Sequence, residues 1–143
     1  MQVINLSQSG GTVRDVVDTQ LPELIGLDPD VVTVAVGAND IDSYDSARFS
    51  TDVDDLTAAL PAGTLIADVP YFMHGRWRRD AEEATELLTA SARAEQLTVV
   101  PLSRVQRVRG SRAMLTDFAA DWFHPNDRGY RVWADASWDE MTR

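Results

Sequence analysis

The sequence contains no cysteine, which excludes disulfide bonds and thiolate metal sites and removes sulfur chemistry as a guide to its redox compartment. Histidine is also scarce, because His74 and His124 are the two that the chain has. A metal site needs several histidine or carboxylate ligands at suitable spacing, and only Asp121 stands at such a spacing from either histidine. The sequence therefore predicts no metal site, and nothing in it calls for a cofactor.

Long apolar runs are absent as well. No stretch approaches the roughly 20 apolar residues of a membrane-spanning helix. Residues 1–12 lack the basic start and apolar core of a signal peptide. The expectation is a cytoplasmic protein with no membrane span. With 143 residues, 44% of them hydrophobic, the chain fits one globular domain, residues 1–143, whose oligomeric state the sequence does not indicate.

Basic residues are few, with 13 lysines and arginines against 23 aspartates and glutamates and a net charge of −10. Such a chain would repel a phosphate backbone, so no nucleic-acid partner is expected. The arginines gather at residues 75–80 and 103–112. Clusters of this kind are typical of a solvated face beside acidic neighbours rather than of an anion site.

Short apolar runs alternate with helical patterns along the chain. Strands are predicted at residues 3–6, 30–37, 64–70 and 97–102. Helices are predicted at residues 13–24, 49–60, 78–95 and 130–141, and the arginine-bearing segment 103–112 is interpreted as irregular. The valine-rich run at 30–37 indicates a strand buried on both faces, as in a parallel sheet covered by helices. The predicted fold class is therefore α/β, with a parallel sheet between helices.

Three loops at the carboxyl ends of these strands have compositions that suit chemistry. In "NLSQSGGTVRD", the backbone N–H groups around Gly10 can form an anion or oxyanion cradle, although a plain glycine turn would give the same pattern. In "VGANDI", Asn39 offers an amide donor and Asp40 can brace the loop, and a simple Asx turn is the alternative. In "DWFHP", Asp121 can accept a hydrogen bond from one ring nitrogen of His124, which leaves the other as a base.

Together these loops resemble the SGNH hydrolase superfamily, also called GDSL-type esterases and lipases. "NLSQSGGT" is similar to the family's second block with its oxyanion glycine at Gly10, "GAND" to the third with Asn39, and "DWFHP" to the fifth with Asp121 and His124. The resemblance implies a three-layer α/β/α sandwich with a flavodoxin-like parallel sheet. It also implies hydrolysis of a small-molecule ester or acylated substrate, by esterase, lipase or carbohydrate-deacetylase chemistry.

The family's first block, the Gly-Asp-Ser stretch with the nucleophile, has no counterpart in this sequence. In the family it lies on the strand before the one that matches residues 3–6. We therefore expect a domain that lacks its first strand at the N-terminus. Residues 1–143 are expected to be inactive because they lack the nucleophilic serine. If so, the strands at 3–6 and 30–37 should either pair directly or leave apolar surface exposed.

Other side chains near these loops are candidates for the substrate pocket: Ser9, Asp40, Tyr71 and His74. Ser7 and Ser9 match positions beside the oxyanion glycine, not the nucleophile. Ser103 also follows a strand, but nothing in the sequence marks it as activated. His74 stands with Tyr71 in an aromatic segment after the third strand, where a surface loop is an equal alternative.

Two other functions fit parts of the sequence. "SQSGGT" also resembles the phosphate loop of flavodoxin-like FMN-binding proteins, and the acidic charge would suit an electron carrier. That interpretation leaves "GAND" and "DWFHP" without a role. The second alternative is a non-catalytic ligand-binding relative of the SGNH fold, which would bind its ligand without turnover.

Overall fold

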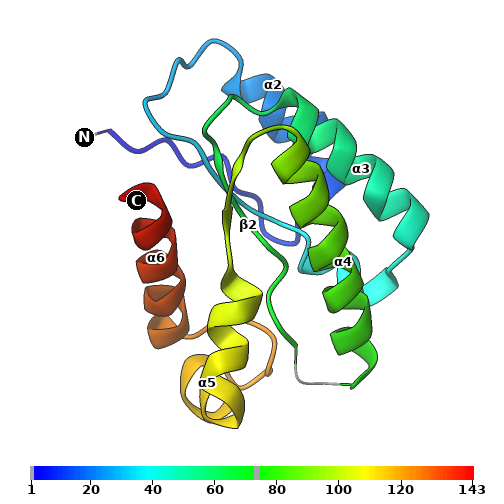
Figure 1. Cartoon of the computed structure of the whole chain (residues 1–143), viewed down its shortest axis with the longest axis vertical. Coiled ribbons are helices and arrows are strands. Elements are labelled where there is room, and N and C mark those ends of the chain that lie inside the picture. Colours follow the sequence, from blue (N-terminus) through cyan, green and yellow to red (C-terminus); the bar gives the residue numbers. More distant parts are fainter. Residues whose placement is uncertain (1, 73–74) are drawn as a thin grey trace.

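The computed structural model describes residues 2–72 and 75–143, without the side chains of Arg76 and Met114. Three parallel strands, β1 (Thr33–Ala35), β2 (Leu65–Ala67) and β3 (Thr98–Val100), form a sheet in the order β1-β2-β3. Helices lie on both sides of this sheet, so the predicted α/β class with a parallel sheet is confirmed (Figure 1).

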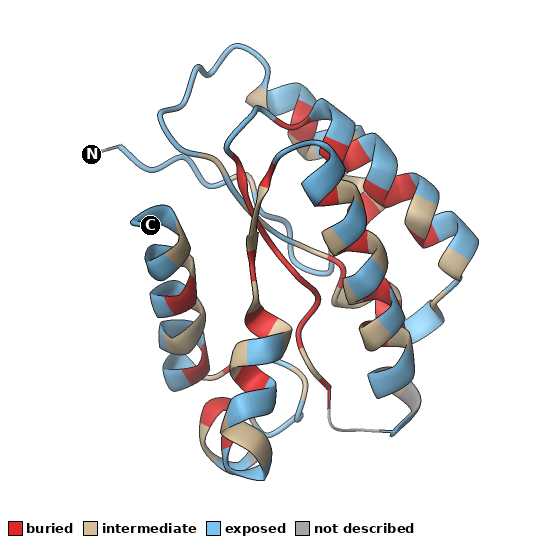
Figure 2. Cartoon of the chain, viewed as in Figure 1, coloured by how far each residue is buried: buried red, intermediate tan, exposed pale blue. Residues whose placement is uncertain are grey.

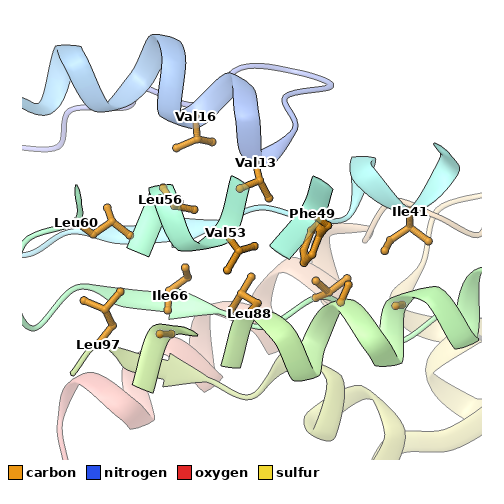
Figure 3. Packing of buried hydrophobic residues seen from close by; sticks show 14 of the residues in the cluster. Val13, Val16, Ile41, Phe49, Val53, Leu56, Leu60, Ile66, Leu88 and Leu97 are labelled. Carbon is orange, nitrogen blue, oxygen red and sulfur yellow. The ribbon is translucent and has the colours of Figure 1, made fainter. Parts of the chain in front are cut away.

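One face of the sheet carries the larger core. Helix α3 (Ser46–Ala59) and helix α4 (Gly75–Ala94) pack side by side there (Figure 1). The short helical segments α1 (Val13–Asp15) and η1 (Val16–Gln20) pack against α3, and α2 (Leu21–Leu24) packs against η1. Their apolar residues recur at helical spacing, so each helix presents one stripe to the core. Figure 3 shows this cluster, which includes Val13, Phe49, Val53, Leu56, Ile66 and Leu88.

The other face is covered by α6 (Asp127–Met141), which contacts β2 and β3. Ala136 and Trp133 of α6 pack with Leu65, Val100 and Leu102 in a second, smaller cluster. As a result the central strand β2 is buried at all three positions, as Figure 2 shows.

Strand β1 departs from the sequence-based prediction, which had both of its faces buried. Val31, Thr33 and Ala35 are exposed, whereas the alternate positions pack against the larger core. The reason is that β1 is an edge strand and α6 lies over β2 and β3. Because neighbouring side chains of a strand point to opposite faces, one face of β1 stays uncovered.

Two other segments also correct the sequence-based predictions. Residues 3–6 form no strand, and Val3 is 76% exposed, because no described strand pairs with this segment. Residues 103–112 belong to a helix, α5 (Leu102–Asp117), which is interrupted at Gly110 by a non-helical φ of 59°. This arginine-rich segment shows no clear helical pattern of apolar residues, so a helix was not predicted there.

None of the helices in residues 2–72 and 75–143 combines the length and apolar character that crossing a bilayer would require.

Candidate active site

The candidate site lies at the carboxyl edge of the sheet. Because the three strands are parallel, the loops that follow them emerge at the same edge. Asn39 and Asp40 follow β1, and Phe72 follows β2. The loop that carries His124 reaches the same edge, since the ring of Phe123 stacks on Phe72 with centroids 5.1 Å apart and planes at 11°.

Asp121 and His124 form a carboxylate–imidazole pair. His124 Nδ1 lies 2.7 Å from Asp121 Oδ2, and the other carboxylate oxygen accepts the backbone N–H groups of Phe123 and His124 at 3.0 Å each. The hydrogen bond from His124, followed by those from the two backbone groups, lowers the pKa of Asp121 from 3.8 to about 2. Asp121 is therefore ionised at neutral pH and can only accept a hydrogen bond.

The consequence for His124 is a defined tautomer. Its Nδ1 must donate to the carboxylate, so Nε2 of the neutral ring carries a lone pair. No side chain in the described part of the chain hydrogen-bonds to Nε2, and the side chain is 62% exposed. In this arrangement Nε2 is able to accept a proton from a donor placed beside it.

The second part of the candidate site is the turn at Gly10 and its contacts with the loop after β1. Gly10 has a φ of 77°, a backbone conformation that favours glycine. Asn39 Nδ2 donates to the Gly11 carbonyl oxygen at 2.9 Å. The amide group has a second N–H available, so this contact still leaves a donor for another acceptor.

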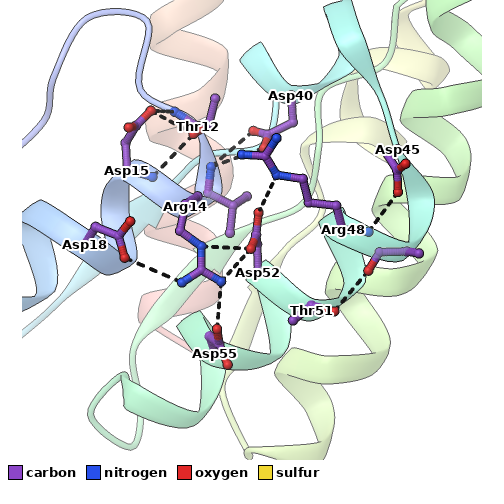
Figure 4. Close-up of polar contacts among 12 residues, drawn as sticks. Thr12, Arg14, Asp15, Asp18, Asp40, Asp45, Arg48, Thr51, Asp52 and Asp55 are labelled. Atoms are coloured by element: carbon purple, nitrogen blue, oxygen red, sulfur yellow. Dashed lines mark hydrogen bonds and ion pairs between the residues drawn. The ribbon is translucent and has the colours of Figure 1, made fainter.

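Asp40 also joins the loop after β1 to the segment that follows Gly10. Its carboxylate oxygens accept the backbone N–H of Val13 at 3.2 and 3.3 Å, at the start of α1 (Figure 4). Burial raises the pKa of Asp40, and the bond from Val13 opposes that shift. Thr12 and Asp15 form a capping box beside it. Asp40 thus braces α1, whereas the sequence suggested that it would brace its own loop.

Arg14 fixes α1 against α3. Its guanidinium donates from Nε to Asp52 at 2.8 Å and from Nη2 to Asp55 at 2.7 Å (Figure 4). Asp52 is buried, with 5% of its surface exposed, so this ion pair also satisfies a carboxylate inside the protein. Gly11 and α1, which follow the Gly10 turn, are consequently held by the loop after β1 and by α3.

The remaining pocket candidates lie in different surroundings. Ser9 is exposed in the turn before Gly10. Tyr71 lines a surface pocket between α4 and α5 together with Thr85 and Ser103, and the Arg107 guanidinium lies 4.9 Å from its ring centre. His74 lies outside the described residues.

None of the described serines is bonded to His124. Ser103 Oγ donates to the buried Asp68 at 2.6 Å, and Ser7 Oγ donates to Asn5 at 2.6 Å. Ser103 therefore donates to a carboxylate and Ser7 to an amide oxygen, and neither has the imidazole partner that activates a serine nucleophile.

The parallel α/β fold and the carboxylate–imidazole pair at its carboxyl edge are features of the SGNH-type hydrolases. The model of the GDSL-like Lipase/Acylhydrolase family matches residues 1–132, and the chain belongs to this family. Among curated proteins, no sequence matches the chain.

Several solved structures share the fold. LAE5, an alpha/beta hydrolase enzyme from the metagenome of Lake Arreo, Spain, aligns with a TM-score of 0.77 and 21% identity over 94% of this chain and 69% of its own. The lipase/acylhydrolase from Enterococcus faecalis aligns with a TM-score of 0.75 and 22% identity, over 94% of this chain and 72% of its own. A variant of Axe2, an acetyl xylan esterase from Geobacillus stearothermophilus, aligns with a TM-score of 0.73 and 22% identity, over 93% of this chain and 69% of its own.

Proposed function

We propose that this chain carries the acid–base and oxyanion groups of a serine ester hydrolase that acts on a small-molecule ester or acylated substrate. The observation that supports this most directly is the 2.7 Å contact between Asp121 and His124, which leaves Nε2 open at the carboxyl edge of the sheet. The acetyl xylan esterase among the structural neighbours makes acetylated carbohydrates one candidate substrate class.

In the proposed reaction a serine hydroxyl gives its proton to His124 Nε2 while its oxygen attacks the ester carbonyl. Asp121 stabilises the resulting imidazolium and keeps the ring oriented. The amide of Asn39 and the backbone N–H groups at Gly10 hold the negative charge on the carbonyl oxygen. His124 then returns the proton to the leaving alcohol, and water releases the acyl group by the same steps.

The serine is proposed to come from a strand outside residues 1–143, since these residues contain no Gly-Asp-Ser motif. The described part of β1 pairs only with β2, so its other edge is open to a further strand. Val31 beside that edge is 51% exposed and Val3 is 76% exposed. Such apolar surface fits the expectation of a missing strand, and residues 1–143 by themselves should be inactive.

Labelling with a fluorophosphonate probe tests the proposal, because the probe reacts with an activated serine. The 143-residue chain should resist labelling, and a form extended upstream by a strand–helix unit with Gly-Asp-Ser should gain labelling and esterase activity on an activated ester. His124→Ala in the extended form should abolish both. Ser137→Ala is the matched control and should change neither, since Ser137 lies in α6 and donates to the Trp133 carbonyl oxygen.

Two results would contradict parts of the proposal. Stoichiometric labelling of the unextended chain at Ser7 or Ser9 would place the nucleophile in the Gly10 turn. An extended form that binds an acylated ligand without labelling or turnover would support the non-catalytic alternative instead.

A further inference from the structure

The side chain of Asn126 uses all of its hydrogen-bonding capacity at the junction between α5, the His124 loop and α6. Its Oδ1 accepts the N–H groups of Arg128 and Gly129 at 3.0 and 3.1 Å, in the first turn of α6. Its Nδ2 donates to the carbonyl oxygens of Thr116 and Phe118 at 3.0 Å each. An N-cap needs only the oxygen, so the two amide bonds serve something other than the start of the helix.

What the amide joins is the two ends of the loop from Phe118 to Pro125. These two residues form an isolated antiparallel bridge, and the Ala119 N–H donates to the His124 carbonyl oxygen at 2.8 Å. Between them Trp122 has a φ of 59° and is 45% exposed. A bulky residue in the left-handed region is held there only when its surroundings enforce it. The loop is therefore a closed, strained turn that depends on its ends.

We infer that Asn126 is a positioning residue, whose Nδ2 closes this loop and thereby holds His124 against Asp121. Asp121 and His124 are three residues apart, and their side chains meet only because the turn at Trp122 folds the chain back on itself. The inference rests on the proposed function, in which His124 is the base. The further step is that His124 is oriented by Asn126 at the start of α6 as well as by the carboxylate of Asp121.

Two substitutions separate the amide from the cap. Asn126→Asp and Asn126→Ser both keep an oxygen that can cap α6, and both lack the N–H donors to Thr116 and Phe118. The Asp variant adds a negative charge and the Ser variant does not. An effect seen in both variants therefore comes from the lost N–H donors, not from an added carboxylate. The control is Asp45→Ala, which removes a side-chain cap from α3, where Asp45 accepts the Arg48 N–H at 2.9 Å.

The measurement is the tautomer of neutral His124, read from imidazole 15N chemical shifts in a His74→Gln background that leaves one histidine. The parent should be protonated at Nδ1, since Asp121 accepts from that atom. In both Asn126 variants the ratio of Nδ1–H to Nε2–H should fall at least about fivefold, the factor for one hydrogen bond of about 1 kcal/mol. Asp45→Ala should leave the ratio unchanged.

The possible failures are distinguishable. A parent chain already protonated at Nε2 would show that the Asp121–His124 pair does not form, which would overturn the proposed function itself. An unchanged ratio in both variants, with α6 intact by far-UV circular dichroism, would overturn the role of Asn126 alone. Loss of α6 in both variants would overturn it too, because the cap would then be the main contribution of Asn126.

Discussion

Gly129 provides a test in which the structure reverses what helix propensity predicts. The residue lies in the first turn of α6, where glycine normally costs about 1 kcal/mol relative to alanine. On propensity alone, Gly129→Ala should stabilise the protein. Yet an added Cβ would lie 2.1 Å from the Asp117 carbonyl oxygen and 2.8 Å from the Pro125 Cβ.

The size of the effect follows from these distances. Carbon and oxygen approach no closer than about 3.3 Å, so α6 and the Asp117 carbonyl must separate by about 1 Å. That carbonyl accepts the Asn126 N–H at 2.9 Å, and a separation of this size weakens the bond. Overpacking costs about 1–3 kcal/mol and the bond about 1 kcal/mol, against a gain of about 1 kcal/mol from propensity. We expect a net loss of about 1–3 kcal/mol in the free energy of unfolding.

Urea unfolding followed by far-UV circular dichroism measures this difference. Gly75→Ala is the matched control, because Gly75 is the first residue of α4 and a Cβ there meets no atom within 4 Å. The control should unfold at the same urea concentration as the parent or a slightly higher one. A Gly129→Ala variant as stable as the parent would refute the close approach of α6 to the end of α5.

Two further predictions concern the His124 loop. The pKa of Asp121 falls from 3.8 to about 2 on folding, so its stabilisation is complete above 3.8 and is lost as the pH drops toward 2. As the pH is lowered across this range, the urea midpoint of Asp121→Asn should consequently fall less than that of the parent. If the midpoints of both proteins fall equally with pH, the Asp121–His124 contact is contradicted. Phe123→Ala should lower the free energy of unfolding by about 1–3 kcal/mol, because Phe123 stacks on Phe72 and meets Trp77 edge-on. Phe123→Leu should recover part of that loss, and equal stability of Phe123→Ala and the parent would show that the stack is not formed.

The sequence by itself determined the features that depend on local patterns. Apolar periodicity placed α3, α4 and α6, and short apolar runs placed β1, β2 and β3 within longer predicted strands. The Asp121–His124 contact was also predictable, because two residues three apart in sequence are near enough to meet in a tight turn.

Only the tertiary structure decided the features that depend on what packs against what. The arginine-rich segment became α5 because Asp68 accepts the Ser103 N–H at its start and Gln106 accepts the Tyr71 N–H, both across 35 residues of sequence. A hydrophilic segment without apolar period gives no sign of such contacts.

The same reason limited what could be known of the Gly10 turn and of the sheet edge. Asn39 meets Gly11 across 28 residues and Asp40 meets Val13 across 27, so these contacts exist only once β1 and α1 are placed together. Residues 3–6 have strand-like composition but no strand beside them, and they remain exposed. A β-strand is stabilised by hydrogen bonds to a neighbouring strand, and which neighbour is present is a property of the assembled sheet.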